Sequence, residues 1–170
     1  MIASVVSSDQ EKYSEAFLGR NNSDYTRWIL TKDAWGGAIE VQILSEYFQV
    51  EIVVVDTMSG SFTRFGESNN FPTRMVLIYD GIHYDALARA FSTSSPVERD
   101  VTRFEVGSPA FTAAQSAAME LVHRLHRERA FTDTAGFTLR CGTCGEGVRG
   151  EAEAQAHALR TGHTNFREYK

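Results

Sequence analysis

Cysteine is scarce in this sequence: 170 residues contain only Cys141 and Cys144, three positions apart. Two cysteines at that spacing cannot supply a disulfide framework, so the chain is predicted to fold in a reducing compartment. Basic charge is also in short supply, because 17 Lys and Arg face 22 Asp and Glu and leave a net charge of −5. A protein that binds nucleic acid or an anionic membrane in general needs a basic face, and this balance argues against both classes.

Long apolar runs are missing as well. No stretch approaches the roughly 20 apolar residues that span a bilayer. The opening MIASVVSSDQEKY lacks the basic start and the apolar centre of a signal peptide. The expected location is therefore the cytoplasm, with the nucleus as a second site. The remaining composition, 42% hydrophobic and 23% charged, is typical of a globular protein with a packed core.

The first third of the chain carries helical signals. Ser8 and Glu11 form the S-x-x-E of a capping box, which predicts a helix that ends at Gly19. A second short helix is expected from Ser23. The segment WGGAIEVQILSEYFQV (35–50) predicts a third helix. Its apolar stripe is expected to consist of Ile39, Ile43, Leu44, Tyr47 and Phe48.

Strand signals follow these helices. VEIVVVD (50–56) and RMVLIY (74–79) are short β-branched runs, which predict buried strands. SFTRF (61–65) is interpreted as the second arm of a hairpin, and DGIHYDAL (80–87) as a turn into a further strand. Helices followed by a cluster of strands predict an α+β fold with α/β layers.

The segment 92–109 loses periodicity and gains serine and proline, so it is predicted to be a loop or linker. Pro109 then opens a long helix. Its apolar positions recur at helical spacing: Ala114, Ala117, Ala118, Leu121, Val122 and Leu125. The opposite face carries His123 and His126 among arginines, and it is interpreted as a solvated surface rather than a metal site.

The C-terminal region carries a C-x2-C pair, twelve intervening residues and then H-x5-H. The four candidate ligands are Cys141, Cys144, His157 and His163. A C-x2-C knuckle lets two thiolates face one ion, and histidines from the following helix complete a tetrahedron, so the pattern predicts one structural zinc ion in a small ββα finger. The alternative is a chance C-x2-C near surface histidines.

His83 stands at the end of an apolar run, with Asp85 two positions later. One interpretation is a histidine that merely completes its hydrogen bonds at a strand end. The other is a general base oriented by a carboxylate, as in nucleophilic hydrolases. Gly81 allows a tight turn there, and alternate residues of a strand share a face, so Asp85 could fix the tautomer of the His83 ring.

Several stretches resemble a known family. These are ASVVSSDQEKYSEAFLG, WGGAIEVQILSEYF, VEIVVVDT, RFGE and VLIYDGIHYD, within residues 2–91. They resemble the ovarian tumour (OTU) family of cysteine deubiquitinases, and most closely its ubiquitin thioesterase subfamily. FTLRCGTCGEGVRGEAEAQAHALRTGHTNF resembles the C-terminal zinc finger of the same subfamily. That subfamily works with the valosin-containing-protein segregase in endoplasmic-reticulum-associated degradation.

The resemblance implies a role for each residue of the histidine loop. His83 would be the catalytic base and Asp85 its orienting acid, and the substrates would be ubiquitin and polyubiquitin conjugates. The residues expected to touch the ubiquitin tail are Tyr79, Asp80, Gly81 and Ile82. The family's nucleophile lies in a D-[SG]-x-C block upstream of the position that matches Met1. The sequence contains no such block, and it also lacks the N-terminal ubiquitin-like domain that docks on the segregase.

These expectations define three parts. Residues 1–91 are expected to be the C-terminal part of an incomplete OTU-like catalytic domain, 92–130 a linker and long helix, and 131–170 the zinc finger. The chain is thus expected to be N-terminally truncated, through a gene-model artefact, a short isoform or a real loss.

Two functions compete for this chain. The leading hypothesis is a deubiquitinase whose nucleophile lies outside the chain. The alternative is a non-catalytic fragment that binds ubiquitin or another partner through the zinc finger. A finger that reads nucleic acid is disfavoured, because its helix opens with Glu151 and Glu153 rather than with basic side chains.

Overall fold

The computed structural model describes residues 1–32, 34–92, 94–128, 138–163 and 165–168. Four helices come first: α1 (Ile2–Ser8), α2 (Glu15–Leu18), α3 (Asn22–Trp28) and α4 (Ala38–Phe48). Five strands and a long helix follow: β1 (Glu51–Asp56), β2 (Phe62–Phe65), β3 (Thr73–Tyr79), β4 (Tyr84–Leu87), β5 (Phe104–Glu105) and α5 (Pro109–Glu128). The C-terminal part contains β6 (Thr138–Cys141), β7 (Gly147–Arg149), α6 (Gly150–Thr161) and β8 (Phe166–Glu168).

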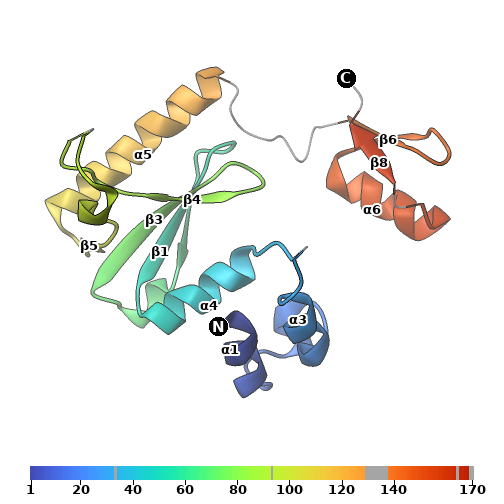
Figure 1. The fold of residues 1–170 in the computed structure, drawn as a ribbon, viewed down its shortest axis with the longest axis horizontal. Helices are drawn as coiled ribbons and strands as arrows, with labels where there is room; N and C mark the ends of the chain where they lie inside the picture. Colours follow the sequence, from blue (N-terminus) through green and yellow to red (C-terminus); the bar gives the residue numbers. More distant parts are fainter. Residues whose placement is uncertain (33, 93, 129–137, 164, 169–170) are drawn as a thin grey trace.

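The larger sheet has the strand order β2-β1-β3-β4, and the mixture of helices and sheets confirms the predicted α+β class (Figure 1). β1 and β3 pair in parallel, whereas β2 pairs with β1 and β4 with β3 in antiparallel fashion. β5 continues along the same edge of β3, opposite its first two residues. The predicted strands at 50–56, 61–65 and 74–79 are all present, each starting within one residue of its expected start, and β4 follows the turn predicted within 80–87.

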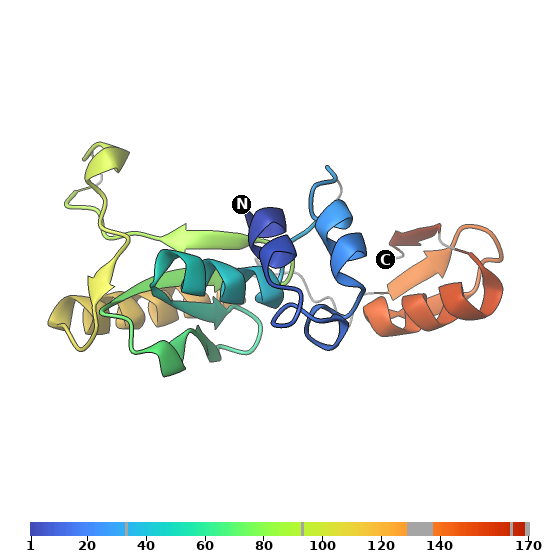
Figure 2. The ribbon, with the colours of Figure 1, turned by 90° about the horizontal axis from the view of Figure 1, so that it is seen from below.

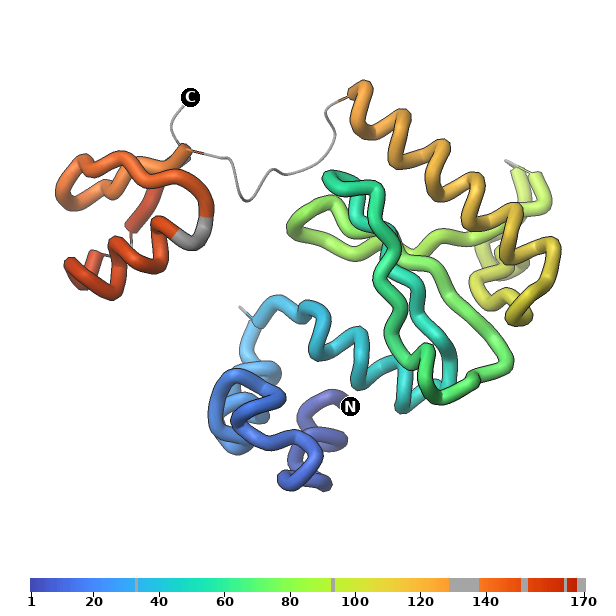
Figure 3. The backbone as a smooth tube through the Cα atoms, turned by 180° about the vertical axis from the view of Figure 1, so that it is seen from behind, coloured from blue at the N-terminus to red at the C-terminus, as the bar shows by residue number. Residues whose placement is uncertain are grey.

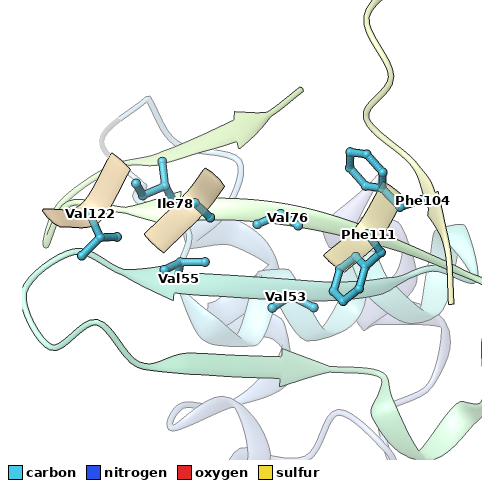
Figure 4. Close-up of a cluster of buried hydrophobic side chains, with 8 residues drawn as sticks. Val53, Val55, Val76, Ile78, Phe104, Phe111 and Val122 are labelled. Atoms are coloured by element: carbon cyan, nitrogen blue, oxygen red, sulfur yellow. The ribbon is translucent and has the colours of Figure 1, made fainter. Parts of the chain in front are cut away.

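One face of this sheet packs against α5. Side chains alternate between the two faces of a strand, and this alternation directs Val53 and Val55 of β1 towards α5. They meet Phe111 and Val122 of α5 in a single cluster that also includes Val76 (Figure 4). Val53, Val55 and Val76 are at most 1% exposed. Each such burial stabilises the fold by about 1.5–3 kcal/mol relative to an exposed side chain.

The other face packs against α4. Ile52 and Val54, the alternate residues of β1, form a second cluster with Val41 of α4 and Val50. Figures 1 and 2 show α4 and α5 on opposite faces of the sheet. The sheet is therefore the middle layer of three, and its central strands are apolar on both faces.

The helices α1 to α3 gather beside α4, on the side of the sheet away from α5 (Figure 3). Their shared core joins Val6, Tyr13 and Tyr25 to Ile43 of α4. Tyr25 is 2% exposed, and its hydroxyl donates a hydrogen bond to the carboxylate of Glu40. The first part of the chain is thereby attached to the sheet through α4.

The prediction for the first helix was wrong at its start. α1 ends at Ser8 instead of beginning there, and the Ser8 hydroxyl donates to the Val5 carbonyl at 2.7 Å. The next residue, Asp9, accepts from the Lys12 N–H at 2.9 Å and makes a turn. The predicted end at Gly19 is confirmed, because Gly19 caps α2 with φ 72°.

The helix that was predicted to start at Ser23 is α3, and it begins one residue earlier, at Asn22. Asn21 caps it, because its side chain accepts from the Ser23 N–H at 3.0 Å. The sequence prediction therefore located this helix but missed the residue that caps it.

The predicted apolar stripe of α4 is only partly correct. Ile39, Ile43 and Leu44 pack against the clusters on its two sides. Tyr47 and Phe48, in contrast, are 55% and 48% exposed in the last turn of α4, just before the chain enters β1. Val41, which is 5% exposed, lies in the core instead.

The segment 92–109, expected to be a loop, contributes β5 and an isolated bridge between Arg89 and Val101. The predicted long helix is confirmed as α5. One residue on its polar face is not simply solvated: the His126 ring bonds to the carbonyl oxygen of Thr57, after β1. The predicted boundary between residues 130 and 131 lies outside the described residues.

The C-terminal part is a three-stranded sheet in the order β7-β6-β8, with α6 between β7 and β8 in the chain. The ββα core is as predicted. β8 was missed, because the three residues Phe166–Glu168 are too few and too polar to give a strand pattern. Among the described helices, none has the length and apolar character needed to cross a membrane.

Candidate functional site

The four predicted metal ligands come together in the C-terminal part. Cys141 ends β6, Cys144 lies in the turn that follows, and His157 is carried by α6. His163 was expected on the same helix but lies beyond it, because α6 ends at Thr161 and Gly162 adopts a left-handed conformation (φ 75°). This reversal of the backbone returns His163 to the cluster.

The cluster is tight, with Cys141 and His157 buried, His163 partly buried and Cys144 exposed. One ligand atom from each of Cys141, Cys144, His157 and His163 can be chosen so that all four lie within 4.8 Å of one another. The Sγ of Cys144 is 3.5 Å from Nε2 of His157. Cys141 and His157 are 1% and 2% exposed. A chance C-x2-C beside surface histidines would not place these atoms together.

The knuckle also favours a thiolate at Cys141. Burial raises the pKa of the Cys141 thiol, but hydrogen bonds from the backbone N–H groups of Cys144 and Thr143 outweigh it and lower this pKa to about 6. The turn is closed by two backbone bonds, from Gly145 N–H to the Cys141 carbonyl and from Cys141 N–H to the Glu146 carbonyl, at 2.8 and 2.9 Å. The backbone fold thus prepares a negative sulfur at the centre of the cluster.

The donor set fits zinc. Two sulfurs and two imidazole nitrogens are the ligands of a closed tetrahedral structural site, in which no position remains for water or substrate. Nδ1 of His157 and Nδ1 of His163 are buried and have no hydrogen-bond partner within the described residues. Buried polar atoms normally have partners, and a histidine bound to a metal commonly makes a hydrogen bond through its other ring nitrogen.

A second candidate centre is the loop between β3 and β4, which carries His83. Gly81 provides the turn with φ 102°, a conformation that other residues rarely adopt. The Asp80 carboxylate accepts from the backbone N–H groups of Ile82 and His83, at 2.9 and 2.7 Å. The Tyr79 hydroxyl donates to the Gly81 carbonyl at 2.6 Å. Three of the four residues predicted to touch substrate therefore shape the loop itself.

His83 and Asp85 are neighbours in space. Nδ1 of His83 lies 3.5 Å from a carboxylate oxygen of Asp85, and the two side chains are 64% and 73% exposed. Next to them, the ring of Tyr84 stacks on that of Tyr79 at 4.5 Å between centroids. Burial raises the pKa of the Tyr84 phenol. A carboxylate beside Nδ1 favours the tautomer of His83 that keeps the proton on Nδ1 and the lone pair on Nε2, where it can accept a proton.

Sequence reasoning missed two charged residues next to the metal ligands. Glu146 and Arg160 lie beside His157, and their side chains pair at 2.6 Å. The signal available in the sequence was weak: a carboxylate two positions after Cys144, inside the knuckle.

Comparison with known protein families assigns both parts of the chain. Residues 1–94 match the family described as OTU-like cysteine protease. Residues 135–169 match the family described as the C-terminal C2H2-type zinc finger of ubiquitin thioesterase OTU1.

Individual proteins agree with these matches. The chain is 46% identical, over its whole length, to "OVARIAN TUMOR DOMAIN-containing deubiquitinating enzyme 2" of Arabidopsis thaliana, and spans 82% of that protein. It is 47% identical to "Ubiquitin thioesterase OTU1" of Gallus gallus and of Homo sapiens, over 99% of its own length. It spans only 54% and 47% of those two relatives, about half of their length.

A solved structure shares the fold. "Structure of Ovarian Tumor (OTU) domain in complex with Ubiquitin" superposes with a TM-score of 0.67 and 30% sequence identity. The alignment covers 78% of this chain and 72% of that one.

Proposed function

Because the chain belongs to the OTU-like cysteine protease family, we propose that it is part of a cysteine deubiquitinase, an isopeptidase that removes ubiquitin from conjugated proteins. The observation that carries this proposal is the loop between β3 and β4. It places His83 3.5 Å from Asp85 and holds the backbone of His83 with the carboxylate of Asp80. Nucleophilic catalysis by a thiol uses an adjacent base that takes the thiol's proton and a third group that orients this base.

In this proposal His83 acts as general base. Asp85 accepts the Nδ1–H, which leaves the lone pair of Nε2 to take the proton of a thiol. The separation of 3.5 Å is long for a hydrogen bond. Catalytic hydrogen bonds are often long in the free enzyme and shorten in the complex with substrate.

The nucleophile is assigned to a cysteine outside these 170 residues. Cys141 and Cys144 are the only two thiols of the sequence, and both belong to the set of predicted metal ligands. The chicken and human relatives are about twice as long as the chain, so they have residues that it does not match. We propose that a segment preceding Met1 in a longer protein supplies the thiolate and the donors that stabilise the tetrahedral intermediate.

The proposed substrates are ubiquitin and polyubiquitin conjugates. The solved OTU domain with the same fold is described in complex with ubiquitin. In this chain Ile82 is 46% exposed beside His83, so the loop offers apolar surface to an extended peptide. The C-terminal tail of ubiquitin, which carries the bond to be cleaved, is the expected occupant.

The cluster of two cysteines and two histidines has a structural role in this proposal. One zinc ion would be held by Cys141, Cys144, His157 and His163 in a closed site, and would supply folding free energy rather than chemistry.

The subfamily resemblance supports a cellular role. We propose that the longer protein works with the valosin-containing-protein segregase in endoplasmic-reticulum-associated degradation, in the cytoplasm or the nucleus. Co-purification of the segregase with the longer protein would support this role, and failure to co-purify would argue against it.

Hydrolysis of a fluorogenic ubiquitin ester and of di-ubiquitin tests the catalytic assignment. The 170-residue chain is expected to show no turnover, whereas the longer protein is expected to cleave both substrates. In the longer protein, His83→Ala should lower kcat/KM by several orders of magnitude, because the thiol loses its base. His123→Ala, on the exposed face of α5, should leave activity unchanged.

Two results would contradict these assignments. Turnover by the 170-residue chain that Cys141→Ser abolishes would make a finger cysteine the nucleophile. Ubiquitin binding by the longer protein without any cleavage would instead support a non-catalytic binding protein.

A further inference from the structure

The turn that contains Cys144 also carries an acidic side chain directed at a metal ligand. An oxygen of the Glu146 carboxylate lies 3.3 Å from Nδ1 of His157. Its other oxygen accepts from the guanidinium of Arg160 at 2.6 Å. We propose that Glu146 is the positioning residue for His157, accepting the proton on Nδ1 so that the lone pair of Nε2 faces the metal.

The orientation of the His157 ring supports this division between its nitrogens. Nε2 is the nitrogen that faces the ligand cluster, 3.5 Å from the Sγ of Cys144. Nδ1 is on the other side of the ring, buried and without a hydrogen bond within the described residues. A buried N–H that finds no acceptor destabilises the fold, so this nitrogen needs a partner.

Glu146 is the acceptor in place to meet that need. The 3.3 Å separation is within reach, although the alignment is not that of a formed hydrogen bond. The final torsion of a glutamate side chain is broad, and this side chain is 45% exposed, so turning the carboxylate into line costs little. Filling the site with a metal fixes the ring and gives the carboxylate a stationary partner.

Arg160 limits where the carboxylate can go. His157 and Arg160 are three positions apart on α6, so their side chains lie on the same face of the helix. Glu146 reaches both from the knuckle, and its own carbonyl accepts from the Cys141 N–H at 2.9 Å. One residue therefore connects the cysteine turn to the helix that carries a histidine ligand.

The expected consequence is tighter zinc binding. Removing the hydrogen-bond acceptor of a metal-binding histidine typically weakens metal affinity about 10–100-fold, because the ring loses its fixed tautomer and orientation. The inference rests on the zinc site proposed above and is independent of the deubiquitinase activity.

The experiment measures zinc affinity of the 170-residue chain by competition with a chromophoric chelator. Glu146→Ala should weaken binding about 10–100-fold, and Glu146→Gln, which keeps a neutral acceptor, should weaken it less. Glu120→Ala, an exposed acidic position on α5, is the matched control and should bind as the wild type does. The circular dichroism spectra of the zinc-saturated variants should match that of the wild type. Matching spectra would show that the variants keep their fold and that only their zinc affinity has decreased.

A spectroscopic signal separates positioning from general stabilisation. In the zinc-loaded wild type, ¹⁵N NMR should show His157 bound through Nε2 with a protonated Nδ1. Coordination through Nδ1, or wild-type affinity in Glu146→Ala, would overturn the inference. Failure of the wild type to bind zinc would overturn the zinc site itself, and the inference with it.

Discussion

At the scale of single residues, Asp80 determines the shape of the loop that presents His83. Its carboxylate is held by the N–H groups of His83 and Ile82, and these bonds lower the pKa of Asp80 below its usual value. A carboxyl with a lowered pKa stabilises the folded form above its ordinary titration range, near pH 4, and this contribution is lost as the pH falls through the folded-state pKa.

Acidification should therefore loosen the loop locally. Amide hydrogen exchange measured by NMR should show the protection of Ile82 and His83 decreasing below about pH 4. Asp80→Asn, which keeps an uncharged acceptor, should show weaker protection at neutral pH and no such decrease. The same pH dependence in both proteins would rule Asp80 out as its cause.

Single residues also show what the sequence could reveal about the site. Cys141, Cys144, His157 and His163 were predictable, because their types and spacing are dictated by the geometry of one ion. The assignment of His83 came from a motif and stays a prediction. Glu146 was not predictable, because its role depends on the side of the His157 ring that faces away from the cluster.

At the scale of elements, the junction between α4 and β2 depends on a glycine. The buried Ser45 hydroxyl lies 2.7 Å from the carbonyl oxygen of Val50 and 2.9 Å from that of Phe65. Gly66 follows β2 with φ 80°, and a Cβ there would collide with the Ser45 Oγ and lie 2.9 Å from the ring of Phe71. Helix and strand approach this closely only because residue 66 has no side chain.

Gly66→Ala should therefore lower the free energy of unfolding by about 2–5 kcal/mol, combining left-handed backbone strain with overpacking. Gly107→Ala is the control, since Gly107 has φ 76° but open space around its Cβ position. It should cost only the backbone strain, about 1–2 kcal/mol. Urea denaturation of both variants measures the difference, and equal losses would contradict the steric argument.

Element types were more predictable than element ends. β1 and β3 were found because buried strands between two helical layers must be apolar throughout. The helix start predicted at Ser8 was wrong. Ser8 and Glu11 match a capping box in sequence, but the Ser8 hydroxyl donates back to the Val5 carbonyl and α1 ends there. The exposure of Tyr47 and Phe48 depends on where α4 ends relative to the apolar clusters, which only the tertiary structure determines.

At the scale of the whole molecule, the two parts differ in what stabilises them. The sheet and its helices bury three apolar clusters. Among its described residues, the C-terminal part buries few apolar side chains, chiefly Val148 and Ala154 beside Cys141 and His157. Cores of this size rarely fold alone, so we expect metal binding to supply most of the folding free energy of this part.

Removal of zinc should unfold one part and spare the other. We expect one zinc ion per chain by metal analysis. A strong chelator should abolish amide protection in residues 138–163 while β1 and β3 keep theirs, and added zinc should restore the loss. Finger amides that stay protected in the metal-free chain would contradict a structural role for the ion.

The parallel pairing of β1 with β3 also has a kinetic consequence. β2 and its two connections lie between β1 and β3 in the chain. The pairing of β1 with β3 therefore closes the whole of this intervening stretch. The hairpin of β1 and β2 is more local, because Val55 pairs with Phe62 across a short turn. Since folding rates fall as contacts become less local, the β1-β2 hairpin should form before β3 pairs with β1. A newly made chain would thus pass through a state in which β1 and β2 are already paired and β3 has not yet joined them.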